Sequence, residues 1–108
     1  MIEEILSAVG IPYRRTRFLH PQAGDYMVWN DSIETDGGDD KVLLYHHTVT
    51  VELYTAAPSP DNEEALETSI AAHGLHFTKE EAFWLQPEQR YQTVYEFEFY
   101  EKRSVDHA

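Results

Sequence analysis

The chain has 108 residues, of which 42% are hydrophobic and 13% are aromatic. This length suits one domain with one core, and the composition argues against a disordered chain because enough apolar surface is available to offset the entropy of ordering. The formal net charge of −12, from 20 acidic and 8 basic residues, argues against a free-standing DNA- or RNA-binding domain because the chain repels phosphates.

Cysteine is absent, which excludes disulfides and thiolate metal sites. The first residues, Met1 to Ile5, contain neither a basic stretch nor a long apolar run, so no signal peptide is predicted. No apolar run approaches the roughly 20 residues needed to cross a bilayer. We therefore expect synthesis in the cytoplasm and no contact with a membrane.

A short helix is predicted over residues 2–9, because Ile2, Ile5, Leu6 and Val9 fall on one helical face. Gly10 and Pro12 end it. Ile11 to Gln22 is then expected to be an extended connector. It carries a basic cluster, which consists of Arg14, Arg15 and Arg17.

Two strands are predicted next, over Tyr26 to Ile33 and over Val42 to Thr55, with a turn or hairpin tip at Asp36 to Asp40 between them. The second strand alternates over its whole length, which predicts one buried face and one face that meets water or a partner. The expected buried face carries Leu43, Tyr45, His47, Val49, Val51 and Leu53. The opposite face carries His46, Thr48, Thr50 and Glu52.

A second helix is predicted over Glu63 to His73, capped by Asp61 or Asn62 and ended by Gly74. Its acidic first turns suit the positive end of the helix dipole. Its narrow apolar stripe is built on Leu66 and Ile70.

A further strand is predicted to begin over Leu75 to Lys79, and Ala82 to Leu85 continues or follows it. A turn at residues 87–89 then leads to a last strand over Arg90 to Glu101. The domain is predicted to span residues 1–102, with a frayed tail over 103–108. The predicted fold class is α+β: a mostly antiparallel sheet of about four strands with two helices packed on it, in the order α-β-β-α-β-β.

No residue pattern indicates catalysis. Neighbouring residues on a strand point to opposite faces, so His46 and His47 cannot ligate one metal together. His47 is interpreted as a hydrogen-bonded core or interface residue rather than a ligand. His73 and His76 could share a metal only if the loop at Gly74 folds back, and His73 fits better as a cation at a helix C-terminus.

Other site classes find little support. Asp36 to Asp40 could bind calcium weakly, but it lacks the spacing of an EF-hand and fits better as a solvated loop. There is no nucleophile motif and no phosphate-binding glycine loop. We therefore predict that the chain is not an enzyme and needs no cofactor or metal.

The remaining candidates concern assembly. The three connector arginines could contact phosphate or an acidic patch on a neighbouring copy, and a solvated connector is an equal alternative. Trp29 and Trp84 are either core residues or interface anchors. The predicted subunit-interface residues are Arg14, Arg15, Arg17, Trp29, His46, Glu52, Glu63 and Glu64.

Several stretches of the chain follow one another in a characteristic order. They are the N-terminal helix with Ile11-Pro12-Tyr13, the strand Tyr26-Met27-Val28-Trp29, the acidic hairpin tip, residues 43–55, Gly74-Leu75-His76-Phe77 after the acidic helix, and residues 90–97. Together, over residues 1 to about 102, they resemble the tail-completion, or tail-terminator, proteins of long-tailed bacteriophages and prophages.

The resemblance implies a non-enzymatic virion protein without cofactor. Such a protein forms a ring, usually a hexamer, that caps the head-proximal end of the tail tube, stops tube growth and offers a surface to the head connector. Its partners would be copies of itself, the tail-tube protein and the head-connector protein, and DNA would pass through the lumen without specific binding. It would be made in the bacterial host cytoplasm and end in the virion tail. A head-closure or connector adaptor and an acidic protein-binding adaptor are the alternatives.

Overall fold

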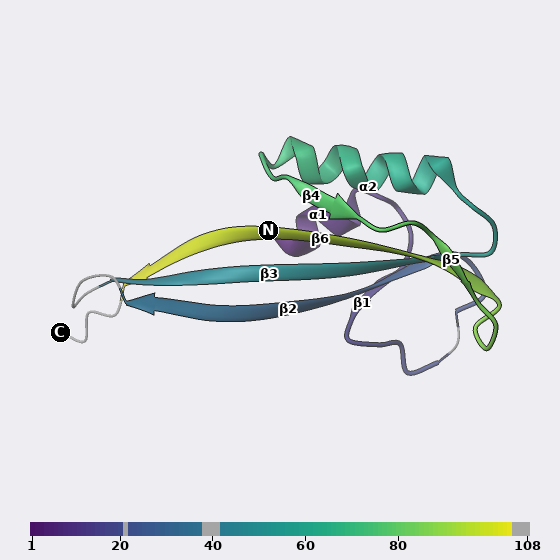
Figure 1. Ribbon diagram of the computed structural model, residues 1–108, viewed down its shortest axis with the longest axis horizontal. Helices are drawn as coiled ribbons and strands as arrows, with labels where there is room; N and C mark the ends of the chain where they lie inside the picture. Colours follow the sequence, from purple (N-terminus) through teal and green to yellow (C-terminus); the bar gives the residue numbers. More distant parts are fainter. Residues whose placement is uncertain (21, 38–41, 105–108) are drawn as a thin grey trace.

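The computed structural model describes residues 1–20, 22–37 and 42–104. Six strands form one sheet in the order β1-β2-β3-β6-β4, with β5 also paired to β6. Both helices lie on one face of this sheet, and three long strands extend past them (Figure 1). The α+β class, the mostly antiparallel sheet and the two helices agree with the prediction.

The N-terminal helix α1 spans Ile2–Ser7 and buries Ile5 and Leu6 against the sheet. It is shorter than the predicted 2–9 because the chain leaves the helix at Ala8, where the backbone N–H of Val9 donates to the carbonyl of Leu6. Gly10 has a φ of +84°, a conformation that glycine adopts without steric cost.

The centre of the sheet consists of β2 (Tyr26–Gly37), β3 (Val42–Thr55) and β6 (Arg90–Ser104). Both β2 and β6 are antiparallel to β3, which lies between them. The predicted bounds of β3 are confirmed, whereas β2 runs four residues beyond Ile33. The strand β6 runs to Ser104, two residues into the stretch expected to be a tail, because Arg103 and Ser104 still pair with β3.

The second helix, α2, spans Pro60–Ala72 and follows Ser59 as N-cap, so it begins earlier than predicted. Proline is favourable in this first turn because its missing N–H is not needed there. Asn62 does not cap the helix; its side chain donates to Asp25 at 2.9 Å. Gly74 ends the helix at a φ of +74° and donates to the carbonyl of Ala71.

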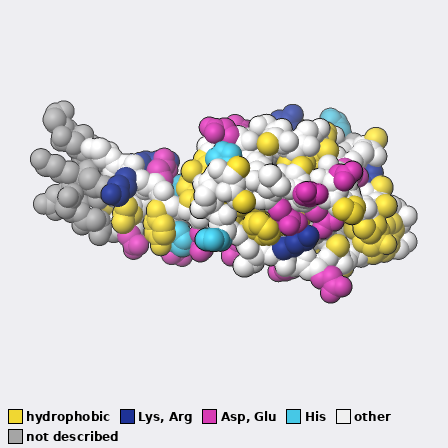
Figure 2. Space-filling model, turned by 90° about the horizontal axis from the view of Figure 1, so that it is seen from above, with side chains coloured by type: hydrophobic (Ala, Val, Ile, Leu, Met, Phe, Trp, Pro, Cys, Tyr) yellow, Lys and Arg dark blue, Asp and Glu magenta, His cyan; other side chains and the backbone are white. Residues whose placement is uncertain are grey.

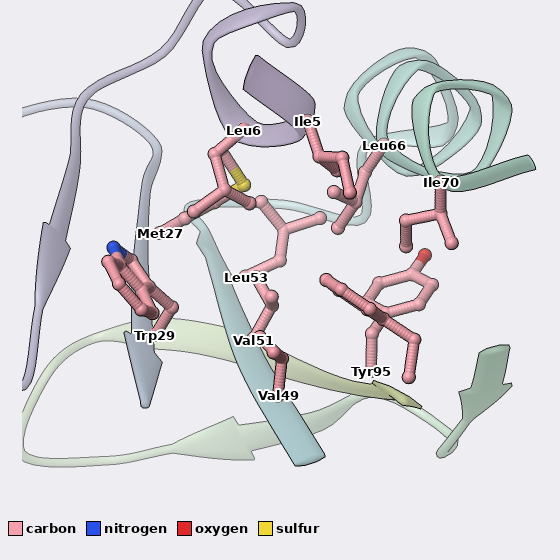
Figure 3. Packing of buried hydrophobic residues seen from close by; sticks show 11 residues of the cluster. Ile5, Leu6, Met27, Trp29, Val49, Val51, Leu53, Leu66, Ile70 and Tyr95 are labelled. Atoms are coloured by element: carbon pink, nitrogen blue, oxygen red, sulfur yellow. The ribbon is translucent and has the colours of Figure 1, made fainter. Parts of the chain in front are cut away.

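The core lies between the helices and the inner face of the sheet, which is the face carrying Met27, Val51 and Tyr95 (Figure 3). Leu66 and Ile70 of α2 contribute fully buried side chains, as predicted. The helices are joined where the Ser69 hydroxyl donates to the carbonyl of Ile5 at 2.8 Å. Neither helix of the described chain is long and apolar enough to cross a membrane.

The sheet has six strands rather than about four, because the connector adds a strand and two short strands stand where one further strand was predicted before the last. The connector contains β1 (Tyr13–Arg15), which pairs in parallel with β2. The other two, β4 (Phe77–Lys79) and β5 (Phe83–Leu85), pair with β6, and the observed order is α-β-β-β-α-β-β-β. Segments of three residues carry no period-2 signal, and only pairing with a long neighbour makes them strands.

Candidate assembly surface

The three long strands form an arm, which we define as residues 31–37 of β2, 42–48 of β3 and 98–104 of β6. The molecule measures 52 × 28 × 21 Å, and the arm projects from one end of the wider body (Figure 2). Apart from the start of α1, whose Ile2 lines a pocket together with His47 and Phe99, no helix lies over the arm (Figure 1). His47 and the Asp31 side chain are buried, whereas most arm residues of β2 and β6 are exposed within the described chain. The arm is therefore the first surface that assembly could use.

His47 holds the three strands of the arm together. Its Nδ1 lies 2.8 Å from Oδ2 of Asp31 on β2, and its Nε2 lies 3.0 Å from Oε1 of Glu101 on β6. Both ring nitrogens of His47 thus contact an acid, one on each neighbouring strand, which confirms His47 as a hydrogen-bonded buried residue.

Ring stacking and the Arg103 guanidinium complete this cluster. The His47 ring stacks on Phe99 with centroids 4.3 Å apart, and the Arg103 guanidinium lies 4.2 Å from the centroid of the Tyr45 ring. Hydrogen bonds from Arg103 and then from His47 lower the pKa of Glu101. Charged groups thus replace the aliphatic core along the inner face of the arm, which fixes the position of its three strands.

The outer face of the sheet, opposite the helices, is polar. His46 stacks on Tyr100 with centroids 4.6 Å apart and lies 3.2 Å from Glu98. Thr48, Thr50 and Glu52 on β3 are half-buried. Glu52 accepts a hydrogen bond from Gln92 of β6 at 2.9 Å. The predicted polar face of β3 is therefore part of a wider surface that carries hydroxyl and carboxylate groups.

The arginine cluster lies at the β1 edge of the sheet. Arg14, Arg15 and Arg17 are exposed, and none contacts a carboxylate within the described residues. Arg15 lies over the ring of Trp29, 5.1 Å from its centroid. Trp29 is 8% exposed and belongs to the core, so it supports this edge from below rather than anchoring a partner directly.

A strained turn separates Arg15 from Arg17. Thr16 has a φ of +72°, and the Arg17 N–H donates to the Arg15 carbonyl at 2.8 Å, which is a γ-turn of the rarer hand. This conformation costs a β-branched residue on the order of 1–3 kcal/mol. It turns the chain away from β2 and leaves Arg14, Arg15 and Arg17 at an exposed corner.

The acidic residues of α2 have different environments. Glu63 and Glu67 hold Lys79 of β4 at 2.9 and 2.8 Å, and the Tyr95 hydroxyl donates to Glu67 at 2.7 Å. Glu64 is exposed. Of the two predicted interface acids on this helix, Glu63 therefore has a partner in its own chain, and Glu64 has a carboxylate directed to solvent.

Replacing Lys79 by alanine is expected to lower the free energy of unfolding by about 1 kcal/mol at neutral pH, since two partly exposed ion pairs are lost. Although burial raises the pKa of Glu67, hydrogen bonds from Lys79 and Tyr95 outweigh it and lower the pKa below its ordinary 4.5. The stability that the Glu67 carboxylate gains from these bonds is present above the pKa that Glu67 has in the unfolded chain. It is lost as pH falls through the lower pKa of Glu67 in the folded chain. Urea unfolding at about pH 7 and pH 3 should therefore give a smaller difference between wild type and variant at pH 3. Lys102→Ala is the matched control, and a pH-independent difference for Lys79→Ala would contradict the expectation.

A cavity of about 560 Å³ lies on the outer face, between the connector and the wide end of the sheet. Its wall includes Tyr26 and Tyr54, whose rings stack 4.8 Å apart. Burial and then the neighbouring Glu52 raise the pKa of Tyr54 to about 12, so this phenol stays neutral.

The histidines do not form a metal centre in the part of the chain described, where no cluster of three or more histidine, cysteine or acidic side chains could hold an ion. His46 and His47 point to opposite faces, as predicted. His73 binds the carbonyl of Ser69 through Nδ1 at 2.9 Å, in the last turn of α2, whereas His76 is exposed. Most of the Asp36–Asp40 loop lies outside the described residues.

Sequence reasoning missed the carboxylate partners of His47. Asp31 lies diagonally from His47, because β3 pairs Ile33 with His47 and Val49 with Asp31. Once the β2–β3 register is known, Asp31 and His47 share the inner face, where an acid is unexpected. An acid and a histidine on the buried sides of adjacent strands are therefore the signal that could have found this pair.

No family model matches the sequence, and no curated protein matches it. Nineteen chains of solved structures match its fold. One of them comes from the structure described as the virion of a native gene transfer agent (GTA) particle, with 14% sequence identity, a TM-score of 0.58, and coverage of 87% of this chain and 81% of that chain. At this identity the likeness shows a shared fold.

Proposed function

We propose that this protein is a structural component of a phage-like virion that ends a long tail tube. In this role it forms a ring on the head-proximal end of the tube, stops tube growth and offers the surface on which the head connector docks. Its partners are copies of itself, the tail-tube protein and the connector, and its place is the virion tail. We propose no enzymatic step and no cofactor.

The observation that carries this proposal is the fold likeness to a chain of a gene transfer agent virion, which extends over 87% of the protein. The tail-terminator resemblance of the sequence supports the narrower role. The arm and the outer face of the sheet add independent support, because both carry polar side chains that face outward.

The outer face of the sheet suits the lumen of a ring through which DNA passes. Its strands bring together Glu34, Glu52, Glu96 and Glu98, with Lys102 near the tip. Carboxylates repel the phosphates of passing DNA, so DNA slides without being held. A head-to-tail ring also requires two different complementary patches on each copy. The exposed arginine corner and the acidic first turns of α2, where Glu64 is exposed, are such a pair, since they differ in charge and position.

Polymerisation of tail-tube subunits, followed by light scattering, tests this function. Addition of the protein at a small fraction of the subunit concentration should stop growth early, because only one end of each tube needs a cap. Binding to the connector without any effect on tube growth would instead favour the head-closure role, and growth that continues unchanged would contradict the proposal.

A further inference from the structure

Both outer strands of the arm have an open edge within the described chain. The strand β1 pairs only with residues 27–29 of β2, and β4 and β5 pair only with residues 95–97 and 90–92 of β6. Residues 31–36 of β2 and 98–103 of β6 therefore have β3 on one side and no strand on the other. Each open stretch presents backbone groups that another strand can bind.

Open edges of this length are unusual in a protein that stays alone. Natural sheets shorten, bend or cover their edge strands, or place proline or charged side chains in them, because a free edge pairs readily with another chain. The two arm edges contain no proline, and between their charged residues they expose Ile33 at 45% and Tyr100 at 63%. Large apolar and aromatic side chains at a free edge fit edges that are covered in an assembly.

We propose that the β6 edge of one arm pairs in parallel with the β2 edge of the arm of a second copy, so that neighbouring arms join into one continuous sheet. This inference rests on the proposed ring and specifies the contact between its subunits. The direction follows from the topology: β2 and β6 are both antiparallel to β3, so they run the same way, and a rotation from copy to copy keeps them parallel.

The side chains that would meet across the two edges support pairing with a second copy. In a ring without a shift along the strands, residues that pair with the same β3 residue meet across the interface. His47 pairs with Ile33 and Phe99, so these two apolar residues meet. Leu44 pairs with Asp36 and Lys102, so these opposite charges meet.

The remaining residue pairs in this register are also compatible with the contact. Glu34 meets Tyr100, Ser32 meets Glu98 and Thr35 meets Glu101, so no carboxylate faces another carboxylate. A backward shift of two residues would place Glu34 beside Glu98, and a forward shift would place Ile33 beside Glu101. The forward shift is also free of acid pairs and sets Glu34 beside Lys102, so only the unshifted register both separates the acids and brings Ile33 onto Phe99.

Disulfide cross-linking tests the contact, since the native chain has no cysteine. The variant Glu34→Cys/Tyr100→Cys places both thiols at exposed positions that meet across the interface. Within one copy these residues lie on either side of His46, about 9.6 Å apart across two strand spacings, which is too far for a disulfide. Mild oxidation should therefore give a ladder of covalent oligomers on non-reducing electrophoresis.

The matched control is Glu34→Cys/Glu96→Cys. Glu96 is also exposed and on the outer face, but β4 covers its edge through Thr78. On non-reducing electrophoresis this control should run as single chains, because its two cysteines do not meet across the interface. Monomers only from the first variant, equal ladders from both, or cross-links to tube subunits in place of a second copy would overturn the proposed pairing.

The outcomes separate this contact from the tube-ending function. Wild-type protein that stops tube growth, together with a first variant that gives no ladder, would remove the arm pairing and keep the function. A ladder from protein that leaves tube growth unchanged would keep the arm pairing and remove the tube-ending role.

Discussion

Replacement of His47 by alanine is expected to lower the free energy of unfolding by about 2–4 kcal/mol, among the largest effects of any single substitution in the arm. The variant leaves Asp31, whose side chain is only 6% exposed, without the His47 ring that contacts it at 2.8 Å. The other oxygen of this carboxylate already lacks a hydrogen-bond partner in the described chain. An uncompensated buried charge is costly because the protein interior solvates it poorly.

Urea unfolding followed by circular dichroism measures this effect, with His46→Ala as the matched control. His46 is the next residue along β3, but it points to the outer face, where its partner Glu98 is 58% exposed. We expect the control to lose less than about 1 kcal/mol. Equal losses for the two variants would show that His47 contributes only packing and would contradict the charged cluster.

Reversal of the three edge arginines to glutamate is expected to abolish ring formation while leaving the fold intact. Each of Arg14, Arg15 and Arg17 is exposed and without a carboxylate partner in the described chain. In the proposed ring these arginines face acidic groups of a neighbouring copy, so their reversal would replace three attractions by three repulsions. At roughly 1 kcal/mol for each reversed contact, assembly should weaken about a hundredfold or more.

Two measurements separate this effect from misfolding. Light scattering reports the oligomer mass, and thermal unfolding reports the fold, which should change little because only Arg15 packs on the core, over Trp29. A triple arginine-to-lysine variant keeps the charge and should retain assembly in large part. Unchanged oligomer mass after charge reversal would contradict a role of this edge in self-association.

The long hairpin was predictable from the sequence, because β3 alternates without interruption over its whole length. That alternation fixed which residues face the helices, and Val49, Val51 and Leu53 are all fully buried. The helix α2 was predictable for a similar reason, since Leu66 and Ile70 repeat at the spacing of one helical face.

The arm and its cluster could not be predicted in the same way. Nothing local distinguishes the part of β3 that lies under the helices from the part that passes beyond them. That division depends on how far the short helix α1 reaches along the sheet. The pairing of Asp31 and Glu101 with His47 depends on the register of three strands whose members are up to 70 residues apart in the chain.

The edge strand β1 was unpredictable for a different reason. Its three residues include Arg14 and Arg15, which favour no strand, and they pair in parallel with β2 only because the chain returns through residues 16–25. The same pairing turned an expected connector into a defined edge. This pairing fixes the arginine cluster at the edge of the sheet. An extended connector without such pairing would have held it loosely.

Electron microscopy of tail tubes grown with the protein tests the tube-ending role most directly. Tubes of uniform length that carry one ring of additional density at a single end, with the protein located in that ring by a specific label, are the predicted result. Tubes of unrestricted length with bare ends, in a sample where the protein is folded and present in excess, would contradict it.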